Sequence, residues 1–433
     1  MRDFAQSYWK KGNWKGASSW TGDNASRLMI NYVTFLQQSE DRGEVDDIFG
    51  KVVSRSLNRW TILQYLTQGY DDFGWTTFCL LDLLHYTYQY ENRYPESYIV
   101  DRLPLLRRRF AFRAAFLHDI MQDSWSLEFC GGGAEWKIRG RKLSLWPSVD
   151  LGGVYKNSIT NHLYSANNAQ IFNASLERPR PAEITEVSLY YIRWFWKLIR
   201  PGLGWPRSTV RPFDFADTDL IRRARQGLDW MAGAQLLTND SLYMDGQRLR
   251  FVQNDPTKRL ELTCDATVHG LFTYNQVAGI RARRHLSRAS GDTTSIKLGH
   301  QEIENLIRAT YSGRLGSHGI LEDACDRFGN CTQDMQVFKG LPPLDIKNFC
   351  EPVDWLDKDF QAEHLKNCTK YRSWVEVNAK AALATVDGSG RFGGYWGSDS
   401  LSNSSLKQTR SIETQVAGLA ILLTSSWFSQ NFH

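Results

Sequence analysis

Residues 69–90 have the sequence GYDDFGWTTFCLLDLLHYTYQY, in which apolar residues recur every three to four positions from Phe73 onward. That spacing places them on one face of a helix, so the stretch predicts a long amphipathic helix. Strand alternation is hard to find elsewhere, and about a dozen helices without a sheet predict an all-α protein, either a toroid of helical hairpins or two bundles. The same periodicity predicts helices at 24–40, 103–121, 155–174, 183–200, 219–237, 271–289, 293–314, 335–349, 372–386 and 410–425.

Loops of different lengths separate these helices, including EFCGGGAEWKIRG (128–140) and QLLTNDSLYMDGQ (235–247). The one candidate for a domain boundary is IRPGLGWPRSTVRPF (199–213), and a surface excursion between two helices explains it equally well. We therefore expect a single domain over residues 1–433, and a monomer.

Composition and charge argue against a nucleic-acid partner and against a membrane-spanning segment. The net charge is only +5, and the arginine-rich stretches 103–113 and 279–290 interleave basic with apolar residues, which favours solvated helix faces over a nucleic-acid surface. No apolar run approaches the roughly 20 residues that span a bilayer. Aromatic residues make up 13% of the chain and include 16 Trp, an excess that asks for a use beyond the core.

The seven cysteines show no zinc pattern, and His85, His118, His269 and His285 lack metal-ligand spacing, so we expect neither a metal nor another cofactor. Two cysteine pairs bracket short polar stretches and predict loop disulfides, Cys325 with Cys331 and Cys350 with Cys368. Cys79 lies in an apolar run and predicts a buried free thiol, whereas Cys130 and Cys264 could pair or stay reduced.

Asn-x-Ser/Thr sequons are about twice as frequent as the composition predicts. Together with the paired cysteines they favour a secreted or cell-wall glycoprotein. The sequons begin at Asn24, Asn173, Asn239, Asn330, Asn367 and Asn403.

Two neighbouring carboxylates, Asp71 and Asp72, stand at the predicted helix start between Tyr70 and the aromatic residues Phe73 and Trp75. Helix capping is the purely structural explanation of one of them. In an aromatic cleft, however, two carboxylates about 5 Å apart titrate as a coupled pair, so that one stays protonated while the other is ionised. Retaining glycosidases need a nucleophile and an acid/base about 5–5.5 Å apart. The pair therefore indicates glycoside hydrolysis.

Further motifs follow one another along nearly the whole chain: SSWTGDNASRLMINY (18–32), EFCGGGAEW (128–136), YKNSITNHLYSANNAQIF (155–172), FTYNQVAGI (272–280), HGILEDACDRFGNCTQDMQVFKG (318–340) and ETQVAGLAILL (413–423). Together with GYDDFGW (69–75), their order and spacing resemble glycoside hydrolase family 76, the endo-alpha-1,6-mannanases and their fungal cell-wall relatives. The resemblance implies an (alpha/alpha)6 barrel of helical hairpins with a mannan-binding groove at one rim. It also implies that Asp71 is the nucleophile and Asp72 the general acid/base.

Other residues that match these motifs are candidates for the groove. Trp20, Trp75 and Trp136 could stack on pyranose rings beside Tyr70, although most Trp residues must lie in the core. The glycines at 131–133 let the backbone pass close to sugar or to a helix. Amide, aromatic and charged candidates for sugar contacts are Asn157, Asn161, Tyr274, Asn275, Gln276, Asp334 and Lys339, of which the last two could instead form a structural ion pair.

Two positions depart from the family pattern, Thr76 where a second Trp is frequent and Ser126 where an Asp is frequent. They bear on substrate preference more than on chemistry. The leading expectation is a retaining glycosidase acting on alpha-1,6-linked mannan or mannosides. The alternatives are a transglycosylase acting on the mannose glycans of GPI anchors in cell-wall assembly, a non-catalytic mannan-binding protein on the same scaffold, and another (alpha/alpha)6 enzyme such as an epimerase or unsaturated-uronyl hydrolase.

Overall fold

The structure is a computed structural model that describes residues 1–36, 42–57, 70–122, 154–156, 218–233, 236–252, 261–397 and 408–432. Its helices are α1 (Arg2–Tyr8), α2 (Ser19–Leu36), α3 (Arg42–Ser56), α5 (Tyr70–Arg93), α6 (Leu103–Gln122), α9 (Thr218–Gly233), α10 (Thr273–Ser290), α11 (Thr293–Tyr311), α12 (Ala324–Phe328), α13 (Leu341–Phe349), α14 (Lys358–Thr369), α15 (Arg372–Ala384) and α17 (Ile412–Asn431), with 3-10 helices η1 (Val100–Arg102) and η3 (Asp334–Gly340). Its strands are β1 (Trp9–Lys10), β2 (Asn13–Trp14), β3 (Val154–Lys156), β4 (Met244–Val252), β5 (Glu261–Leu271), β6 (Gly316–Ser317) and β7 (Ile320–Leu321).

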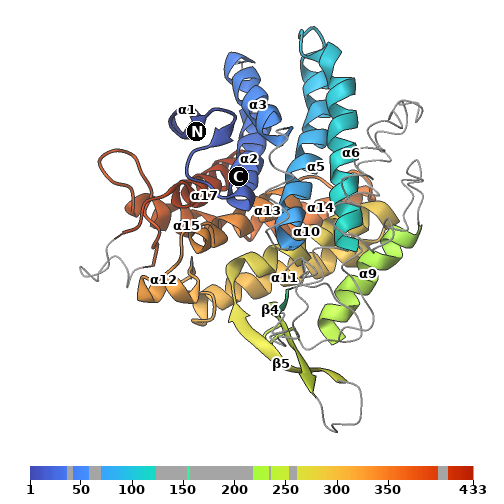
Figure 1. Ribbon diagram of the computed structural model, residues 1–433, viewed down its shortest axis with the longest axis vertical. Coiled ribbons are helices and arrows are strands. Elements are labelled where there is room, and N and C mark those ends of the chain that lie inside the picture. Colours follow the sequence, from blue (N-terminus) through green and yellow to red (C-terminus); the bar gives the residue numbers. More distant parts are fainter. Residues whose placement is uncertain are drawn as a thin grey trace, which may run out of the picture.

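In this part of the chain, α5, α2, α17, α13 and α10 contact one another in that order, and Arg281 of α10 reaches Asp82 of α5, so we call these inner helices the ring. Helices α6, α3, α15 and α11 pack against α5, α2, α17 and α10 as outer partners (Figure 1). Helix α17 is buried around most of its circumference, as expected for a helix at the centre of a helical protein. The arrangement is that of helical hairpins closed into a barrel.

The inner helices run in the same direction around the ring. Trp20 in the first turn of α2 contacts Trp75 near the start of α5, and it also contacts Phe338, which lies just before α13. Phe338 in turn contacts Tyr274, the second residue of α10. Thr21 of α2 donates a hydrogen bond to Glu413, the second residue of α17. One end of the ring is therefore formed by helix N-termini, which we call the N-terminal end, and the opposite end by helix C-termini.

The periodicity of the sequence predicted most of these helices correctly. Helices α2, α5, α6, α9, α10, α11, α15 and α17 overlap their predicted ranges. The predicted helix at 335–349 is divided into η3 and α13, and Pro342 and Pro343, which lack N–H donors, stand at the start of α13. Helices α3 and α14 were not predicted. The predicted helix at 183–200 lies outside the described residues, as does that at 155–174 except for its first two positions.

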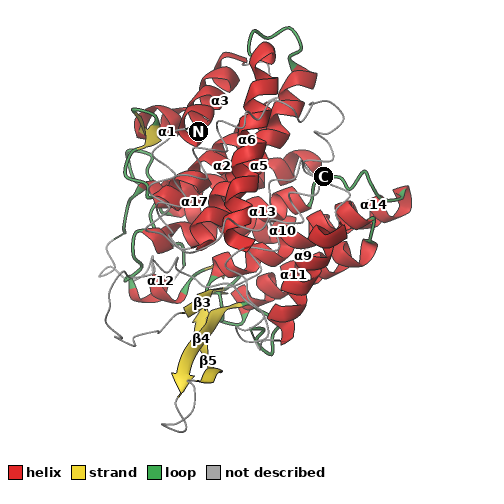
Figure 2. Ribbon diagram, turned by 45° about the vertical axis from the view of Figure 1, so that its right-hand side comes forward, coloured by secondary structure: helices red, strands yellow, loops and turns green. Residues whose placement is uncertain are grey.

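The expectation of a chain without a sheet was wrong. Strands β3, β4 and β5 form an antiparallel sheet in that order, which projects from the helices at the bottom of Figure 2. Tyr155 and Lys156 belong to β3, so the helix predicted from residue 155 does not begin there. The predicted loop 235–247 contains the start of β4. The signal was present in β5, where Leu262, Cys264, Ala266 and Val268 alternate with polar residues.

Two arginines and two aspartates, which we call the charge ring, lie midway along four inner helices. Arg27 of α2 donates to Asp82 of α5 at 3.0 Å and to Asp345 of α13 at 2.8 Å. Arg281 of α10 contacts the same two carboxylates at 2.6 and 3.4 Å. Although burial opposes the charged form, Asp345 and Asp82 raise the pKa of Arg27 above its ordinary value. The charge ring thus fixes α2, α5, α10 and α13 relative to one another.

Both predicted disulfides are confirmed, Cys325–Cys331 and Cys350–Cys368, and Cys79 is a buried free thiol as predicted. Across the described ranges, no helix has the length and apolar character needed to cross a bilayer. One sequon is unsuited to glycosylation, because Asn24 is 1% exposed within α2. Its side-chain amide accepts a hydrogen bond from Arg27 and donates one to the Trp20 carbonyl oxygen.

Candidate functional site

The Asp pair lies at the N-terminal end of the ring, in the first turn of α5. Asp72 is half-buried, and its carbonyl oxygen accepts a hydrogen bond from the Thr76 hydroxyl at 3.2 Å. Residues three and four apart share a helix face, so Trp75 is one turn away from both aspartates. The backbones of Tyr70 and Asp71 belong to α5, but their side chains lie outside the described part of the molecule.

Aromatic side chains from separate segments meet next to this turn, and we call them the aromatic floor. Its central ring is Phe338, whose centroid lies 6.0 Å from Trp20, 4.4 Å from Tyr274 and 5.6 Å from Phe272. Trp20 lies 6.2 Å from Trp75. The structure thus brings together three predicted candidates, Trp20, Trp75 and Tyr274, and adds two rings that sequence reasoning missed.

The TYNQ segment at the start of α10 divides into residues with different surroundings. The Tyr274 hydroxyl donates to Asp245 of β4 at 2.6 Å, so the β-hairpin delivers a buried carboxylate to the floor. Gln276 has a structural role, because its side-chain amide forms hydrogen bonds with both the N–H and the carbonyl oxygen of Tyr243, each at 2.9 Å. Asn275 is 1% exposed, yet neither end of its amide has a hydrogen-bond partner within the described residues. A buried amide without partners is costly, which marks Asn275 as a group suited to a polar ligand.

Thr76, the departure nearest the Asp pair, belongs to a buried polar network. Its hydroxyl donates to Asp23 of α2, and Asp23 accepts from Arg55 of α3 at 2.6 Å. A Cβ atom on Gly22 would fall 2.2 Å from Arg55 Nη2, so the arginine needs a glycine beside it. Sequence reasoning missed Asp23 and Arg55, because nothing in their local pattern indicates that α2, α3 and α5 meet there.

The suggested ion pair between Asp334 and Lys339 was wrong. Lys339 is fully buried, with Nζ 2.5 Å from Asp326 Oδ1 and 2.6 Å from the Gly394 carbonyl oxygen. Asp334 is exposed and accepts a hydrogen bond from Ser18 at 3.3 Å. Burial selected the partner of Lys339, since an ammonium group removed from water needs a buried anion. The structure therefore places Lys339 inside the protein and Asp334 at its surface.

Asp326 also belongs to an acidic cluster that holds the start of α10. Asp323 accepts hydrogen bonds from the backbone N–H and the hydroxyl of Thr273 at 2.7 and 2.8 Å. Burial, and then the neighbouring Asp326, raise the pKa of Asp323 to about 7. This cluster fixes the position of the Tyr274 and Asn275 backbone and so supports the floor.

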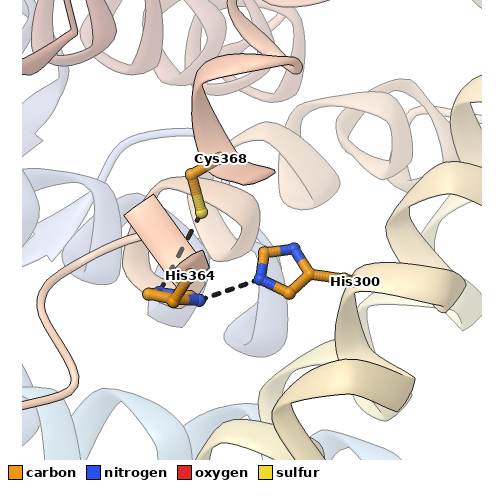
Figure 3. A group of neighbouring side chains, drawn as sticks. All are labelled: His300, His364 and Cys368. Atoms are coloured by element: carbon orange, nitrogen blue, oxygen red, sulfur yellow. Dashed lines mark hydrogen bonds between the residues drawn. The ribbon is translucent and has the colours of Figure 1, made fainter. Parts of the chain in front are cut away.

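A second group of side chains with metal-ligand character lies away from the Asp pair, between α11 and α14 (Figure 3). His300 Nε2 lies 2.9 Å from His364 Nδ1, and His300 Nδ1 lies 2.6 Å from the Tyr371 hydroxyl. The third member, Cys368, is bonded to Cys350 and so lacks the thiolate that would bind a metal. In this oxidised state the group is a buried hydrogen-bonded chain.

Several predicted candidates lie outside the described residues. They are Trp136, Asn157, Asn161, Ser126, Cys130 and the glycines at 131–133, while Cys264 is placed only by its backbone in β5.

Neither a scan against protein-family models nor a search of curated proteins finds a match to this sequence. Among solved structures, the chain is similar to the alpha-1,6-mannanase GH76A of Salegentibacter sp. HEL1_6, with a TM-score of 0.57 and 15% identity over 99% of this chain and 97% of that one. An inactive variant of that enzyme, in which two consecutive aspartates are replaced by asparagine, was solved in complex with alpha-1,6-mannotriose.

The chain is also similar to Dfg5 from Chaetomium thermophilum in complex with glucosamine, with a TM-score of 0.60 and 15% identity over 96% of this chain and 82% of that one. A family 76 alpha-mannanase from Bacteroides thetaiotaomicron has a TM-score of 0.52 and 12% identity over 99% and 94% of the two chains. At such identities the comparison shows the fold. The chain therefore has the (alpha/alpha)6 barrel fold of glycoside hydrolase family 76, as its motifs predicted.

Proposed function

We propose that this chain is a retaining glycosidase of the family 76 type that acts on alpha-1,6-linked mannan or mannosides. The observation that carries the proposal is the position of the Asp71–Asp72 turn beside the aromatic floor, at the end of the ring where helix N-termini meet. The partial positive charge of helix N-termini favours carboxylates there. The inactive variant of the Salegentibacter mannanase, in which two consecutive aspartates are replaced by asparagine, supports the same assignment.

In the proposed reaction, the Asp71 carboxylate attacks the anomeric carbon while Asp72 gives its proton to the departing glycosidic oxygen. The bond between the anomeric carbon and that oxygen breaks, and a covalent ester to Asp71 forms. Asp72, now ionised, removes a proton from water, whose oxygen attacks the anomeric carbon and releases Asp71. The anomeric configuration is retained because the carbon is inverted twice.

The surrounding residues bind and orient the sugar in this proposal. Trp20 and Tyr274 of the floor are partly buried, so each keeps a surface on which a pyranose ring can pack. The Asn275 amide offers a donor and an acceptor that one sugar hydroxyl, or a water held by it, can satisfy. Asp245 orients the Tyr274 ring through the hydroxyl hydrogen bond.

A transglycosylase is the second candidate, favoured by the similarity to Dfg5 in complex with glucosamine. The covalent intermediate is the same in both reactions, and only the acceptor differs. A sugar hydroxyl that replaces water in the second step would lengthen a glycan instead of shortening it.

The test is incubation with alpha-1,6-mannotetraose followed by sizing of the products. If all products are shorter than the tetraose, the protein is a hydrolase. If products longer than the tetraose also form, it is a transferase. We expect Asp71→Asn and Asp72→Asn to abolish either activity while still binding the tetraose, and the exposed Asp101→Asn to behave like the wild type. Binding without turnover in the wild type would make the protein a mannan-binding module and overturn the proposal.

The proposal extends to export of the chain as a glycoprotein. Two disulfides and exposed sequon residues such as Asn239 and Asn330 support it. Peptide mapping of protein secreted from a eukaryotic host should find glycan at these surface positions and none at Asn24. Glycan at Asn24 would contradict its burial in α2.

A further inference from the structure

A cavity of about 480 Å³ lies in the half of the ring that faces away from the Asp pair. Helices α2, α5, α10 and α13 line it, together with the segment that follows α13. On α5 the lining begins at Leu81, ten residues beyond Asp71, which is about 15 Å along a helix. Pockets for small molecules have volumes of about 300–1,000 Å³. The cavity is thus large enough for a ligand of its own.

Most charges in the cavity wall neutralise one another. Of the charge ring, Arg281, Asp82 and Asp345 line the cavity, and Arg27, which does not line it, pairs with both carboxylates. Glu351 of the wall is paired with Lys347, which is buried outside the lining, at 2.8 Å between Oε1 and Nζ. These groups need no external counter-ion, so the character of the ligand depends on the charges that remain.

The remaining charges are mainly cationic, on Arg284 and Arg288 of α10. Arg284 donates to the carbonyl oxygens of residues 349, 351 and 352 at 2.9–3.0 Å. Carbonyl oxygens carry only partial charge, and neither guanidinium has a salt bridge within 4.0 Å among the described residues. Both lie against Trp355, with Cζ 4.9 and 5.4 Å from the ring centroid. Among the described residues that line the cavity, the exposed Asp354 likewise has no salt bridge within 4.0 Å, and its charge acts on Arg284.

Burial lowers the pKa of Arg284 to about 10, and although Glu351 and Asp354 favour its charged form, they do not offset burial and the neighbouring Arg288. Burial also lowers the pKa of His285, next to Arg284, and the three arginines Arg281, Arg284 and Arg288 lower it further. The outer part of the cavity therefore carries positive potential, and Arg288, which is exposed, can move to meet an anion.

The inner part of the cavity has a different chemistry. Asp345 and Arg281 are 2% and 7% exposed. Oδ2 of Asp345 and Nε of Arg281 nevertheless have no hydrogen-bond partner in the described portion of the chain. Asn31 and Asn348 line the same cavity with amides. One acceptor and one donor left unsatisfied beside two amides match the hydroxyl groups of a polyol.

We infer that this cavity binds a carbohydrate carrying one anionic group, a sugar phosphate or a sugar acid. Its anion lies at Arg288 and Arg284, and its hydroxyls reach Asp345 and Arg281. Guanidinium groups bind oxyanions through paired hydrogen bonds, and the Trp355 ring offers a flat surface to the sugar. The site is separate from the Asp pair and does not depend on which reaction occurs there.

Calorimetric titration at constant ionic strength tests the inference with a matched series of hexoses. Glucose 6-phosphate and glucuronate are the two anionic probes, and whichever binds more tightly identifies the anion. Glucose tests the sugar alone and inorganic phosphate tests the anion alone. We expect at least one anionic sugar to bind at least tenfold more tightly than both controls. If glucose binds as tightly as the anionic sugars, the anion site is disproved. If inorganic phosphate binds as tightly as they do, the site for the sugar hydroxyls is disproved.

Arg288→Gln is the decisive variant because Arg288 is exposed and its loss leaves the core intact. Because a guanidinium paired with an oxyanion forms a charge-assisted hydrogen bond, we expect its removal to lower affinity about tenfold or more. The control is Arg308→Gln, an exposed arginine of α11 outside the cavity, which should leave affinity unchanged. Equal affinity of Arg288→Gln and the wild type overturns the assignment, and the ligand series in the wild type tests it without any variant.

Discussion

The two ends of the inner ring differ in the chemistry that the same helices present. At the N-terminal end, aromatic rings and a neutral amide lie beside the helix turn that carries Asp71 and Asp72, whereas toward the C-terminal end the cavity is lined by arginines without salt bridges in the described part of the chain. Helix dipoles favour this division, since anions are stabilised at helix N-termini and cations at C-termini. Arg284 shows the second case directly, because it donates to the carbonyl oxygens at the end of α13. Because the inner helices are parallel, the two ends of the barrel differ in the charge that they favour.

The charge ring between the two ends should give the largest effect on stability. Arg27→Met leaves Asp82 and Asp345 with Arg281 as their only cation in the ring, and breaking a buried ion pair costs about 3–5 kcal/mol. We expect urea denaturation to show a loss of that size. Arg42→Met is the control, since Arg42 is 44% exposed and its pairing with Asp46 contributes less than about 1 kcal/mol. Similar losses of free energy in both variants would mean that the charge ring does not fix the four inner helices relative to one another.

Acid should destabilise the protein through the histidine chain, which belongs to neither end. Burial lowers the pKa of His300 to about 3, helped by His364, and burial lowers that of His364 to about 4. Both values lie below the ordinary 6.5, so the stabilisation is complete above pH 6.5 and is lost as the pH falls toward 4.

At pH 5 the loss is about 2 kcal/mol for each histidine that stays neutral in the folded state. Urea denaturation between pH 7 and pH 5 measures it, and His364→Gln should flatten the dependence. An unchanged slope in that variant would assign the acid sensitivity to another group.

The adjacent amides of α10 sharpen the assignment of the N-terminal end with a smaller effect. Gln276→Leu removes hydrogen bonds to the Tyr243 backbone and should lower the free energy of unfolding by about 1–3 kcal/mol. Asn275→Leu removes an amide that has no hydrogen-bond partner among the described residues and should leave that free energy unchanged or raise it by about 1 kcal/mol. Affinity for alpha-1,6-mannotriose should fall in Asn275→Leu. A destabilised Asn275→Leu with unchanged affinity would give Asn275 a structural role.

The helices were predictable because their apolar period is local, as in residues 73–90 of α5. The disulfides were predictable for the same reason, since each joins cysteines close in sequence. The alternation in β5 was also visible, but the helical periodicity around it drew the interpretation away. Local patterns were therefore sufficient to predict helices and disulfides, and the two-residue alternation in β5 was sufficient to indicate a strand.

The partners of the charged residues were not predictable. Lys339 lies closer in sequence to Asp334 than to Asp326, yet burial pairs it with Asp326. Arg27 meets Asp345, 318 residues away, only because α2 and α13 lie in one ring. Asp245 reaches Tyr274 through a hairpin that the sequence interpretation lacked. Such contacts depend on how elements assemble, which spacing along the chain does not encode.

Closure of the ring also sets when the protein can fold. Helix α2, near the beginning of the chain, contacts α17, near its end, and Thr21 and Glu413 are 392 residues apart in the hydrogen bond that joins them. All of the residues between α2 and α17 must therefore leave the ribosome before α2 finds this neighbour. Contacts of such long sequence separation slow folding. Until α17 has been synthesised, a nascent chain would therefore leave the face of α2 that contacts α17 uncovered.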